Sequence, residues 1–392
     1  MSTWKQRYTA LAIIVLNTCL LFAAVNLVLW GALRFFRRSR PFDPVATFGL
    51  ATVLKGYPGW KPEDVVALNR EMGKLDETVY EYEPFTQFKH RPLLGRYLNI
   101  DPDGFRIDKS QGSWPPERNG FNIFLFGGST TFGVGVPDDE TIPSYLQEYM
   151  AAHCTTPAAV YNFGRLGYFS TQEVLLYYRL LSSGDVPTVA VFVDGINDFH
   201  SRSGEPDLTM ELKSLLAAEH RSLHPPSDLP VWRAANLLRR WMAGEHAAPT
   251  SPDYRDARFL AGVVSRLRTN ERLIETLGSA FHVEPLFVWQ PVPVYKYDLR
   301  HHFLNGLDYR RLFQYADGAK YGYPVMAEAR DEFESGGRFL WLADIQEGRS
   351  ENFYVSDGLH YTGRFCQEIA GAIYQFMLRK GLLGALGCRA AG

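Results

Sequence analysis

The stretch NIFLFGGSTT at residues 122–131 joins a short apolar run to a glycine turn that carries a serine. Apolar runs of this length, bounded by turn residues, are typical of buried strands, and four more follow along the chain. Segments with helical spacing separate them, so the sequence predicts an α/β fold: a three-layer α/β/α arrangement around a five-stranded parallel sheet. The predicted strands are Asn122–Phe126, Ala159–Phe163, Val189–Val193, Pro285–Trp289 and Arg338–Ala343, and the predicted helices include Thr141–Ala151, Thr171–Leu181 and Thr362–Leu378, the last with Thr362 as its N-cap.

Length and composition are those of an ordinary globular protein. The chain has 392 residues, 46% hydrophobic and 21% charged, and a formal net charge of -2. Such a chain has no general attraction to polyphosphate, so we expect no nucleic-acid partner. The four cysteines, Cys19, Cys154, Cys366 and Cys388, include no Cys-x-x-Cys pair. Because Cys19 lies in an apolar segment, we expect at most one disulfide in the rest of the chain, and cysteine usage alone does not indicate the redox compartment.

A charge-free apolar run, Thr9–Leu33, lies near the N-terminus. It exceeds the ~20 residues that a bilayer core requires and the ~7–15 residues of a signal-peptide core, which favours a transmembrane anchor over a cleaved signal. Lys5 and Arg7 precede the run, and an arginine cluster within Arg34–Arg40 follows it. The cluster favours a cytoplasmic domain by the positive-inside rule, whereas a short basic tail before a first helix commonly stays inside. The flanks therefore leave the orientation open.

These patterns predict four parts. Residues 1–40 form the anchor with its basic flanks, 41–119 a membrane-proximal neck, 120–380 the α/β domain and 381–392 a C-terminal tail. Loops with Pro and Ser interrupt the α/β rhythm at about residues 200–283, where Pro230–Met242 and Asp256–Leu277 have helical spacing. We interpret this stretch as a helical insertion beside the sheet.

The turn from Gly127 to Thr131 follows the first strand, at the sheet edge where open parallel sheets bind ligands. Its glycines allow a sharp bend that presents Ser129 near a helix start, whose free N–H groups suit a developing oxyanion. A phosphate-binding loop would need lysine where Val134 stands, and the elbow of α/β-hydrolases would need glycine where Thr131 stands. A purely structural turn remains the alternative.

Two further motifs follow later strands. Residues 194–198 read DGIND, in which the Asn197 amide could donate a hydrogen bond into the crevice; the alternative is a capped turn. Residues 356–360 read SDGLH, a spacing that lets Asp357 accept a hydrogen bond from the near ring nitrogen of His360. The far nitrogen could then take a proton from a serine. A surface Asp–His pair is the alternative.

In chain order these motifs resemble the blocks of the SGNH hydrolase family, also called the GDSL esterases and lipases. The matching segments are Gly127-Gly128-Ser129, Asn162–Gly167, Gly195–Asp198 and Asp357–His360. The resemblance spans about residues 120–380 and implies a flavodoxin-like fold with Ser129 as nucleophile, His360 as base and Asp357 as its partner. It also implies an oxyanion hole made by the N–H groups of Ser129 and Gly167 and by the Asn197 amide.

This chain departs from the family motif at Gly128, where the family has aspartate. We therefore expect another residue to provide the hydrogen bonds that support Ser129. Gly164 is a second candidate for the backbone donor of the oxyanion hole, and the family spacing favours Gly167.

The resemblance implies a membrane-anchored serine esterase that forms an acyl-enzyme and needs neither a cofactor nor a metal. Its substrate would be an O-acyl ester in an acetylated envelope glycan or a lipid. An O-acyltransferase acting on a polysaccharide would use the same residues, and a non-catalytic, membrane-tethered assembly protein would keep only the fold. Because the resemblance is to envelope-associated members, we expect the domain on the periplasmic side. Neither the substrate nor the oligomeric state follows from the sequence.

Other polar and aromatic residues give weaker candidates. His220 and His224 have the spacing of a metal-binding pair, but no glutamate follows the first, so we expect no metal site. His301 and His302 follow the fourth strand and are interpreted as a substrate-side or surface loop. The stretch Trp289–Tyr295 at the same edge either lines a substrate pocket or is a proline-stiffened connection that packs inside.

Overall fold

The computed structural model describes residues 3–36, 42–77, 80–108, 110–200, 229–242, 253–307 and 316–390. The chain forms two compact units, each described here by itself. One comprises Met1–Arg40 and Met210–Ser251, and the other comprises Pro41–Thr209 and Pro252–Gly392. Much of the expected insertion at 200–283 lies outside the described residues.

The first unit contains helix α1 (Thr3–Phe36) and helix α10 (Pro230–Met242), the latter over the range that its spacing predicts. Mean hydropathy within Thr3–Leu33 reaches 2.4, and the apolar side chains there are largely exposed. This helix is long and apolar enough to cross a membrane, a test that an N-terminal signal sequence also passes. The Asn26 side chain accepts a hydrogen bond from the Val231 N–H at 3.1 Å, which ties α10 to α1.

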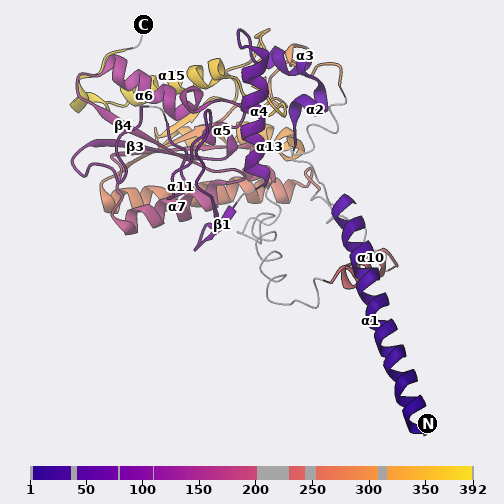
Figure 1. Ribbon diagram of the computed structural model, residues 1–392. Coiled ribbons are helices and arrows are strands. Elements are labelled where there is room, and N and C mark those ends of the chain that lie inside the picture. The colour runs from indigo at the N-terminus through magenta and orange to yellow at the C-terminus, as the bar shows by residue number, and fades with distance from the viewer. Residues whose placement is uncertain are drawn as a thin grey trace. The chain divides into compact units, whose positions relative to one another are not determined.

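The second unit is built on the predicted five-stranded parallel sheet (Figure 1). Its strands are β3 (Phe121–Gly127), β4 (Ala158–Gly164), β5 (Val189–Asp194), β6 (Glu284–Trp289) and β7 (Phe339–Trp341). They pair in the order β4-β3-β5-β6-β7, and Ile123 is in register with both Val160 and Val189. Strand β4 lies on one side of β3, and β5, β6 and β7 follow on the other side. The boundary between β3 and β5 is therefore a switch point, at which such sheets bind ligands beyond the carboxyl ends of their strands.

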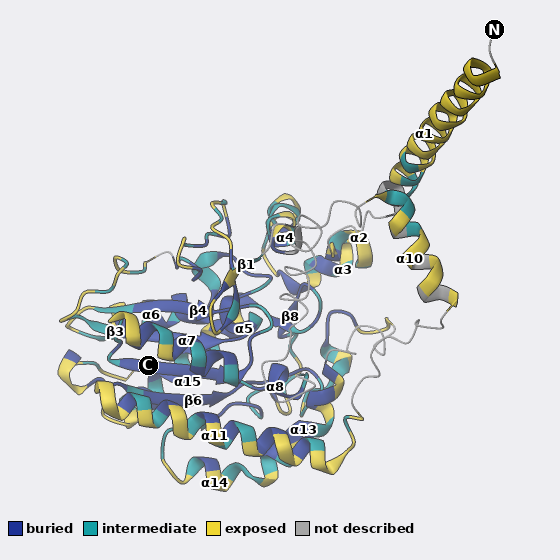
Figure 2. Cartoon of the chain, turned by 90° about the horizontal axis from the view of Figure 1, so that it is seen from below, coloured by how far each residue is buried: buried dark blue, intermediate teal, exposed yellow. Residues whose placement is uncertain are grey.

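Helices cover both faces of this sheet, as the alternating pattern predicts (Figure 1). Helices α6 (Ile142–His153) and α15 (Gly363–Arg379) pack together on one face, and α7 (Ser170–Ser183) and α11 (Ala257–Phe281) on the other. The predicted N-cap of α15 is present, because Thr362 Oγ1 accepts a hydrogen bond from the Phe365 N–H at 3.2 Å. The strands between the layers are buried, as the dark blue ribbons of Figure 2 show.

The segment expected to form a neck belongs to the same compact unit as the sheet. It contains α2 (Pro44–Phe48), α3 (Leu50–Val53), the 3₁₀ turn η1 (Leu54–Gly56), α4 (Pro62–Glu77) and the antiparallel strands β1 (Tyr80–Glu83) and β2 (Gln87–His90). Val65 and Leu68 of α4 share a hydrophobic cluster with Phe132 and Val355. This segment therefore contacts the elements on which the candidate site lies.

Shorter elements complete the unit. They are α5 (Ser129–Phe132), η2 (Asp138–Glu140), α8 (Ile196–His200), η4 (Leu299–His301), α13 (Asp317–Glu328), α14 (Arg330–Glu334), the antiparallel pair β8 (Tyr354–Val355) and β9 (His360–Tyr361), and η6 (Gly384–Leu386). A disulfide between Cys154 and Cys388 joins the expected C-terminal tail to the end of α6. Cys19 and Cys366 are free thiols.

Candidate active site

Ser129 is the first residue of α5, the single helical turn that directly follows β3. The bend before it requires glycine, because a Cβ on Gly127 would collide with the Thr131 hydroxyl and lie 2.9 Å from the Val193 carbonyl. Ser129 itself is half-buried. The sharp turn therefore presents this serine at the carboxyl edge of a central strand, beside the switch point.

Asn197 lies in α8, the turn after β5, and is 6% exposed. Its Nδ2 donates to the Tyr168 carbonyl at 2.6 Å. A Cβ on Gly128 would collide with this same nitrogen. The Asn197 amide thus lies against the backbone just before Ser129, in the space that an aspartate side chain at position 128 would need. Aspartate at position 128, as in the motif that this segment resembles, would therefore not fit without a shift of Asn197.

Asp357 lies on the tight loop that joins β8 to β9, and His360 is the first residue of β9. His360 Nδ1 lies 2.9 Å from Asp357 Oδ1, and the Leu359 N–H donates to the same oxygen at 2.9 Å. Ser356 and Gly358 have φ angles of 58° and 90°, so the loop bends tightly enough to bring the carboxylate and the ring together. The predicted Asp–His pair is therefore formed, and its imidazole is largely buried.

Opposing effects act on the pKa of Asp357. Burial raises this pKa, while the charge and hydrogen bond of His360, together with the N–H groups of Leu359 and His360, lower it. The lowering effects are the larger, so the pKa of Asp357 stays below its ordinary value of 3.8 and the carboxylate is ionised at neutral pH. An ionised Asp357 accepts the Nδ1–H of His360, and this tautomer leaves Nε2 as the basic nitrogen of the ring.

His302 supports this loop and is buried, whereas the sequence suggested a substrate-side or surface loop for His301 and His302. It is 2% exposed, its Nε2 lies 3.0 Å from the Gly358 carbonyl, and its Nδ1 lies 3.1 Å from the Leu304 N–H. Because an N–H can only donate to Nδ1, the ring proton is on Nε2 and bonds Gly358. Burial lowers the pKa of His302 to about 4, against the raising effects of the Gly358 bond and the Asp357 charge. The ring is therefore neutral at pH 7.

Gln290 connects the two halves of the site. Thr130 Oγ1 donates to Gln290 Oε1 at 2.5 Å. The Tyr361 hydroxyl, which donates to the Pro291 carbonyl at 2.6 Å, lies 3.2 Å from the same Oε1. Thr130 directly follows the predicted nucleophile and Tyr361 directly follows the predicted base, and α5 contacts β9. The structure thus brings the serine turn and the histidine strand together at one edge of the sheet.

The two glycines after β4 differ in their surroundings. The Gly164 N–H donates to Asn162 Oδ1 at 3.0 Å, and a Cβ on Gly164 would collide with the Phe132 nitrogen. Gly164 is therefore required for close packing, and its N–H already has a partner. Gly167 is half-buried and has a φ of 73°, a conformation that favours glycine.

Asp198, the neighbour of Asn197, is fully buried and serves the scaffold. Its Oδ1 accepts hydrogen bonds from the Ser170 hydroxyl at 2.6 Å and from the Ser170 N–H at 3.3 Å. Arg266 Nη2 donates to the Asp198 carbonyl at 2.8 Å. Since Ser170 begins α7, Asp198 joins the end of β5 to that helix. Burial raises the pKa of Asp198 despite the opposing charge of Arg266 and the bonds from Ser170.

The connection after β6 packs inside the domain. Trp289 and Val292 are 1% and 2% exposed, and Gln346 Nε2 donates to the carbonyls of Val292 and Tyr295 at 2.7 and 2.9 Å. These contacts agree with a proline-stiffened connection. The sequence placed Gln290 and His302 after the fourth predicted strand, at the edge of the sheet where the site lies. It did not predict that Gln290 joins the two halves of the site or that His302 supports the loop, because their position after a strand is the only local signal that these residues carry.

Within the described residues, no group of three or more His, Cys, Asp or Glu side chains could hold a metal ion. His220 and His224 lie outside those residues.

Along the chain the motifs occur in the order serine, glycine, asparagine, then aspartate and histidine; the first three follow β3, β4 and β5 of the parallel sheet, and the last lies in the β8–β9 hairpin. The blocks of the SGNH hydrolase family, which these motifs resemble, occur in the same order. Similar solved structures include the lipase/acylhydrolase from Enterococcus faecalis, with 14% identity, a TM-score of 0.39, and coverage of 69% of this chain and 98% of that one. A lipase from a goat rumen metagenome has 13% identity, a TM-score of 0.40, and coverage of 65% and 97%.

A carbohydrate acetylesterase family member from Sinorhizobium meliloti has 15% identity, a TM-score of 0.35, and coverage of 67% of this chain and 99% of that one. No protein-family model and no curated protein matches this sequence. The roles proposed below for the SGNH-type site therefore follow from this chain's own residues.

Proposed function

We propose that the chain is a membrane-anchored serine ester hydrolase of the SGNH type, in which Ser129 is the nucleophile, His360 the base and Asp357 the carboxylate that orients the base. The observation that carries the proposal is the 2.9 Å contact between Asp357 and His360, on a strand that contacts the Ser129 turn. A serine hydroxyl is a weak nucleophile until a neighbouring base can remove its proton. In the proposal, His360 is that base.

In the proposed reaction, His360 Nε2 takes the Ser129 proton as the serine oxygen bonds to the acyl carbon. The tetrahedral intermediate then collapses, its bond to the alcohol oxygen breaks, and the imidazolium returns the proton to the departing alcohol. Water attacks the acyl-enzyme by the same steps and releases the carboxylic acid with the free serine. The ionised Asp357 stabilises the imidazolium in both halves of the cycle.

The proposed oxyanion hole consists of the N–H groups of Ser129 and Gly167 and the amide of Asn197. Contact of the Asn197 nitrogen with Gly128 supports its assignment, and the bond to the Tyr168 carbonyl fixes the orientation of the amide plane. The engaged N–H of Gly164 favours Gly167 as the backbone donor. Each such donor contributes ~2.7–4 kcal/mol of transition-state stabilisation in a comparable site.

The proposed substrate is an O-acyl ester of an envelope glycan or lipid, and the proposed location is the extracytoplasmic side of a membrane. Helix α1 supports attachment to a membrane. The Cys154–Cys388 disulfide supports an oxidising compartment, because disulfides seldom persist in the cytosol. Protease treatment of spheroplasts tests the location: digestion of the catalytic domain is expected, and its full protection while a periplasmic control protein is degraded would contradict it.

Product analysis tests the reaction. Purified full-length protein in detergent is incubated with p-nitrophenyl acetate and with acetylated xylan, each with and without an oligosaccharide acceptor. We expect free acetate at a rate that does not depend on the acceptor, and none from the Ser129→Ala variant. Preferential transfer of acetyl to the acceptor would identify an acyltransferase. Equal turnover by the wild type and Ser129→Ala would refute the catalytic proposal.

A further inference from the structure

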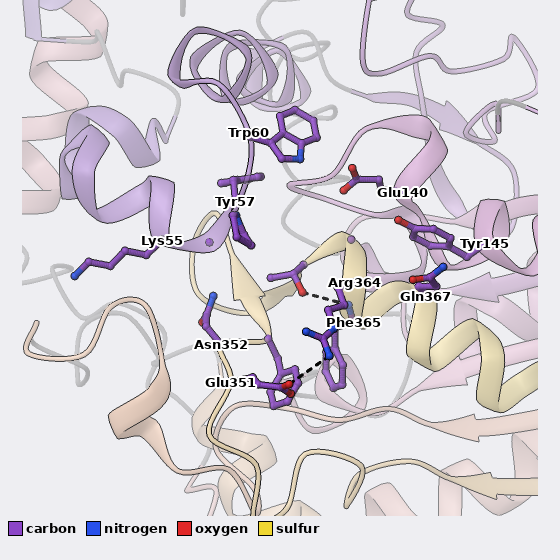
Figure 3. A pocket seen from close by; sticks show the side chains of 15 residues that line it. Lys55, Tyr57, Trp60, Glu140, Tyr145, Glu351, Asn352, Arg364, Phe365 and Gln367 are labelled. Carbon is purple, nitrogen blue, oxygen red and sulfur yellow. Dashed lines mark hydrogen bonds and ion pairs between the residues drawn. The ribbon is translucent and has the colours of Figure 1, made fainter.

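A cavity of about 430 Å³ lies between the N-terminal segment of the second unit and the β8–β9 hairpin. Figure 3 shows Trp60 and Tyr57 on one side of it, Tyr145 and Gln367 on the other, and Glu140 between them. Asn352 also lines the cavity, two residues before the β8–β9 hairpin that carries Asp357 and His360. The cavity therefore lies beside the segments that lead into and out of this hairpin, since Phe353 directly precedes β8 and Thr362 directly follows β9.

A second cavity of about 580 Å³ adjoins the first, because Trp60 and Glu140 line both. It continues along Tyr97 and Asn99 toward Asp138. Each cavity has the size of a small-molecule site, ~300–1,000 Å³. The two cavities with their shared residues Trp60 and Glu140 are called here the Trp60 groove.

Trp60 is held firmly at the centre of the groove. Its ring centroid lies 5.9 Å from that of Tyr57 and 6.1 Å from that of Tyr97. The Tyr57 hydroxyl donates to the Gly135 carbonyl at 2.8 Å, which fixes the turn preceding Trp60 on the domain. Trp60 nevertheless remains half-buried, so part of its ring faces the groove. A rigid indole in such a position can receive the apolar face of a ligand ring with little loss of conformational entropy.

Glu140 provides a hydrogen-bonding group beside this ring. A Cβ on Gly363, the first residue of α15, would collide with its carboxylate, so the groove keeps its shape only with glycine at that position. Burial, with the neighbouring charge of Asp139, raises the pKa of Glu140 to about 7. At neutral pH the carboxyl group can therefore both donate and accept hydrogen bonds, as ligand hydroxyl groups require.

The charges of the groove do not favour an anionic ligand. Five carboxylates and three cations line the two cavities. Arg364 lies 3.3 Å from Glu351, and Arg96 lies 3.1 Å from Asp64, so both guanidinium groups already face a carboxylate. A polyanion would therefore find two of the three lining cations already paired, whereas a neutral polyhydroxy chain needs no cationic partner. The alternation of aromatic and polar side chains also differs from the continuous apolar lining that an acyl chain would need.

We propose that the Trp60 groove binds the chain of a neutral polysaccharide, with one sugar ring resting on Trp60 and its hydroxyl groups bonded to Glu140 and Asn352. This inference deepens the proposed ester hydrolysis and rests on it for the role of the bound chain, which is to hold an acylated sugar near Ser129. Binding itself does not require the reaction.

The test is calorimetric titration of the full-length Ser129→Ala variant in detergent with xylotetraose, chitotetraose and tetragalacturonate. We expect at least one neutral tetrasaccharide to bind more tightly than tetragalacturonate and than its own monosaccharide. Adding Trp60→Ala should weaken that binding by roughly tenfold or more, the usual loss for a central aromatic anchor, and Trp60→Phe should give an intermediate value. Tyr82→Ala, which removes a 64% exposed aromatic from β1, is the matched control and should leave affinity unchanged.

Absence of binding by both neutral tetrasaccharides would overturn the proposal, as would tighter binding of tetragalacturonate. Equal weakening by Trp60→Ala and Tyr82→Ala would also overturn it, because the loss would then not be specific to the groove. Thermal melts show whether Trp60→Ala is misfolded. If it is, the affinity of Trp60→Phe for the tetrasaccharide tests the role of Trp60 instead. Turnover of p-nitrophenyl acetate by the wild type tests the proposed reaction separately, so a failure of the groove and a failure of the catalytic assignment give different results.

Discussion

His302 Nε2 donates to the Gly358 carbonyl at 3.0 Å, so a buried neutral ring fixes the loop on which Asp357 and His360 face each other. The same ring accepts the Leu304 N–H, and both of its nitrogens are therefore engaged. His302 is a positioning residue in this account, since it acts on the pair through the backbone between them.

Replacing His302 should lower kcat more than it changes KM. His302→Leu removes the donor to Gly358, and we expect a fall in kcat of ~10², the usual effect of a misplacement of about 1 Å at a catalytic group. His302→Gln retains an amide donor and should recover part of the rate. Steady-state kinetics on p-nitrophenyl acetate, with melting temperatures as the control, make the comparison. If both variants lose the same activity in proportion to their stability, the role is structural only.

The lowered pKa of His302 also predicts a dependence of stability on pH. The folded protein resists protonation of this ring until about pH 4, whereas the unfolded chain takes up the proton near pH 6.5. Between these two pH values the unfolded state thus binds more protons than the folded state. The contribution of the neutral His302 ring to the free energy of unfolding is therefore fully present above pH 6.5 and is lost as the pH falls toward 4. The expected loss is on the order of 2–3 kcal/mol.

Denaturant unfolding at pH 7 and at pH 4.5 measures this effect as the difference in free energy of unfolding between the wild type and His302→Gln. The free energy of unfolding of the wild type should exceed that of His302→Gln by less at pH 4.5 than at pH 7. His90, whose pKa burial lowers to about 3, is present in both proteins and cancels in the difference. An advantage that is independent of pH would mean that His302 is protonated alike in both states.

Asn197→Ala and Asp198→Ala should fail in different ways. The Asn197 amide is assigned to the oxyanion, so its loss should slow acylation by ~10²–10³ while the protein stays folded. Asp198 bonds Ser170 at the start of α7, so its loss should mainly lower the free energy of unfolding. Stopped-flow acylation and thermal melts separate the two. Equal kinetic losses in two equally stable variants would show that the division of roles is mistaken.

Restoring the family's aspartate at position 128 should harm this protein. In Gly128→Asp the new Cβ would collide with Asn197 Nδ2, so we expect a loss of activity and of stability although the sequence then matches the motif better. Gly336→Ala is the matched control, because a Cβ at Gly336 would have no atom within 4 Å. A Gly128→Asp enzyme as active as the wild type would show that Asn197 can move aside without loss of function.

The sequence predicted those features that local patterns determine. The five strands, the Thr362 N-cap and the 2.9 Å approach of Asp357 to His360 follow from short-range spacing, and the structure confirms them. The contact of Thr130 with Gln290 joins residues 160 positions apart, and no local pattern encodes such a distance. Similarly, a histidine in a polar loop reads as exposed, and only the packed domain shows that His302 is buried.

The packing of the N-terminal segment escaped prediction for the same reason. The apolar spacing of α4 indicates a helix with one buried face, but nothing near it in sequence identifies Phe132 and Val355 as part of the surface that it covers. Trp60 likewise gains its significance from two cavities whose walls come from separate parts of the chain.

The central claim is that His360, held by Asp357, activates Ser129, and labelling with a fluorophosphonate probe tests it most directly. We expect mass spectrometry to find the probe on Ser129 of the wild type. His360→Ala should nearly abolish labelling because no other base is assigned, and Asp357→Asn should reduce it because the charge that fixes the tautomer is lost. Both variants should keep a melting temperature close to that of the wild type. Labelling of a different serine, or an unchanged labelling rate in His360→Ala, would contradict the account.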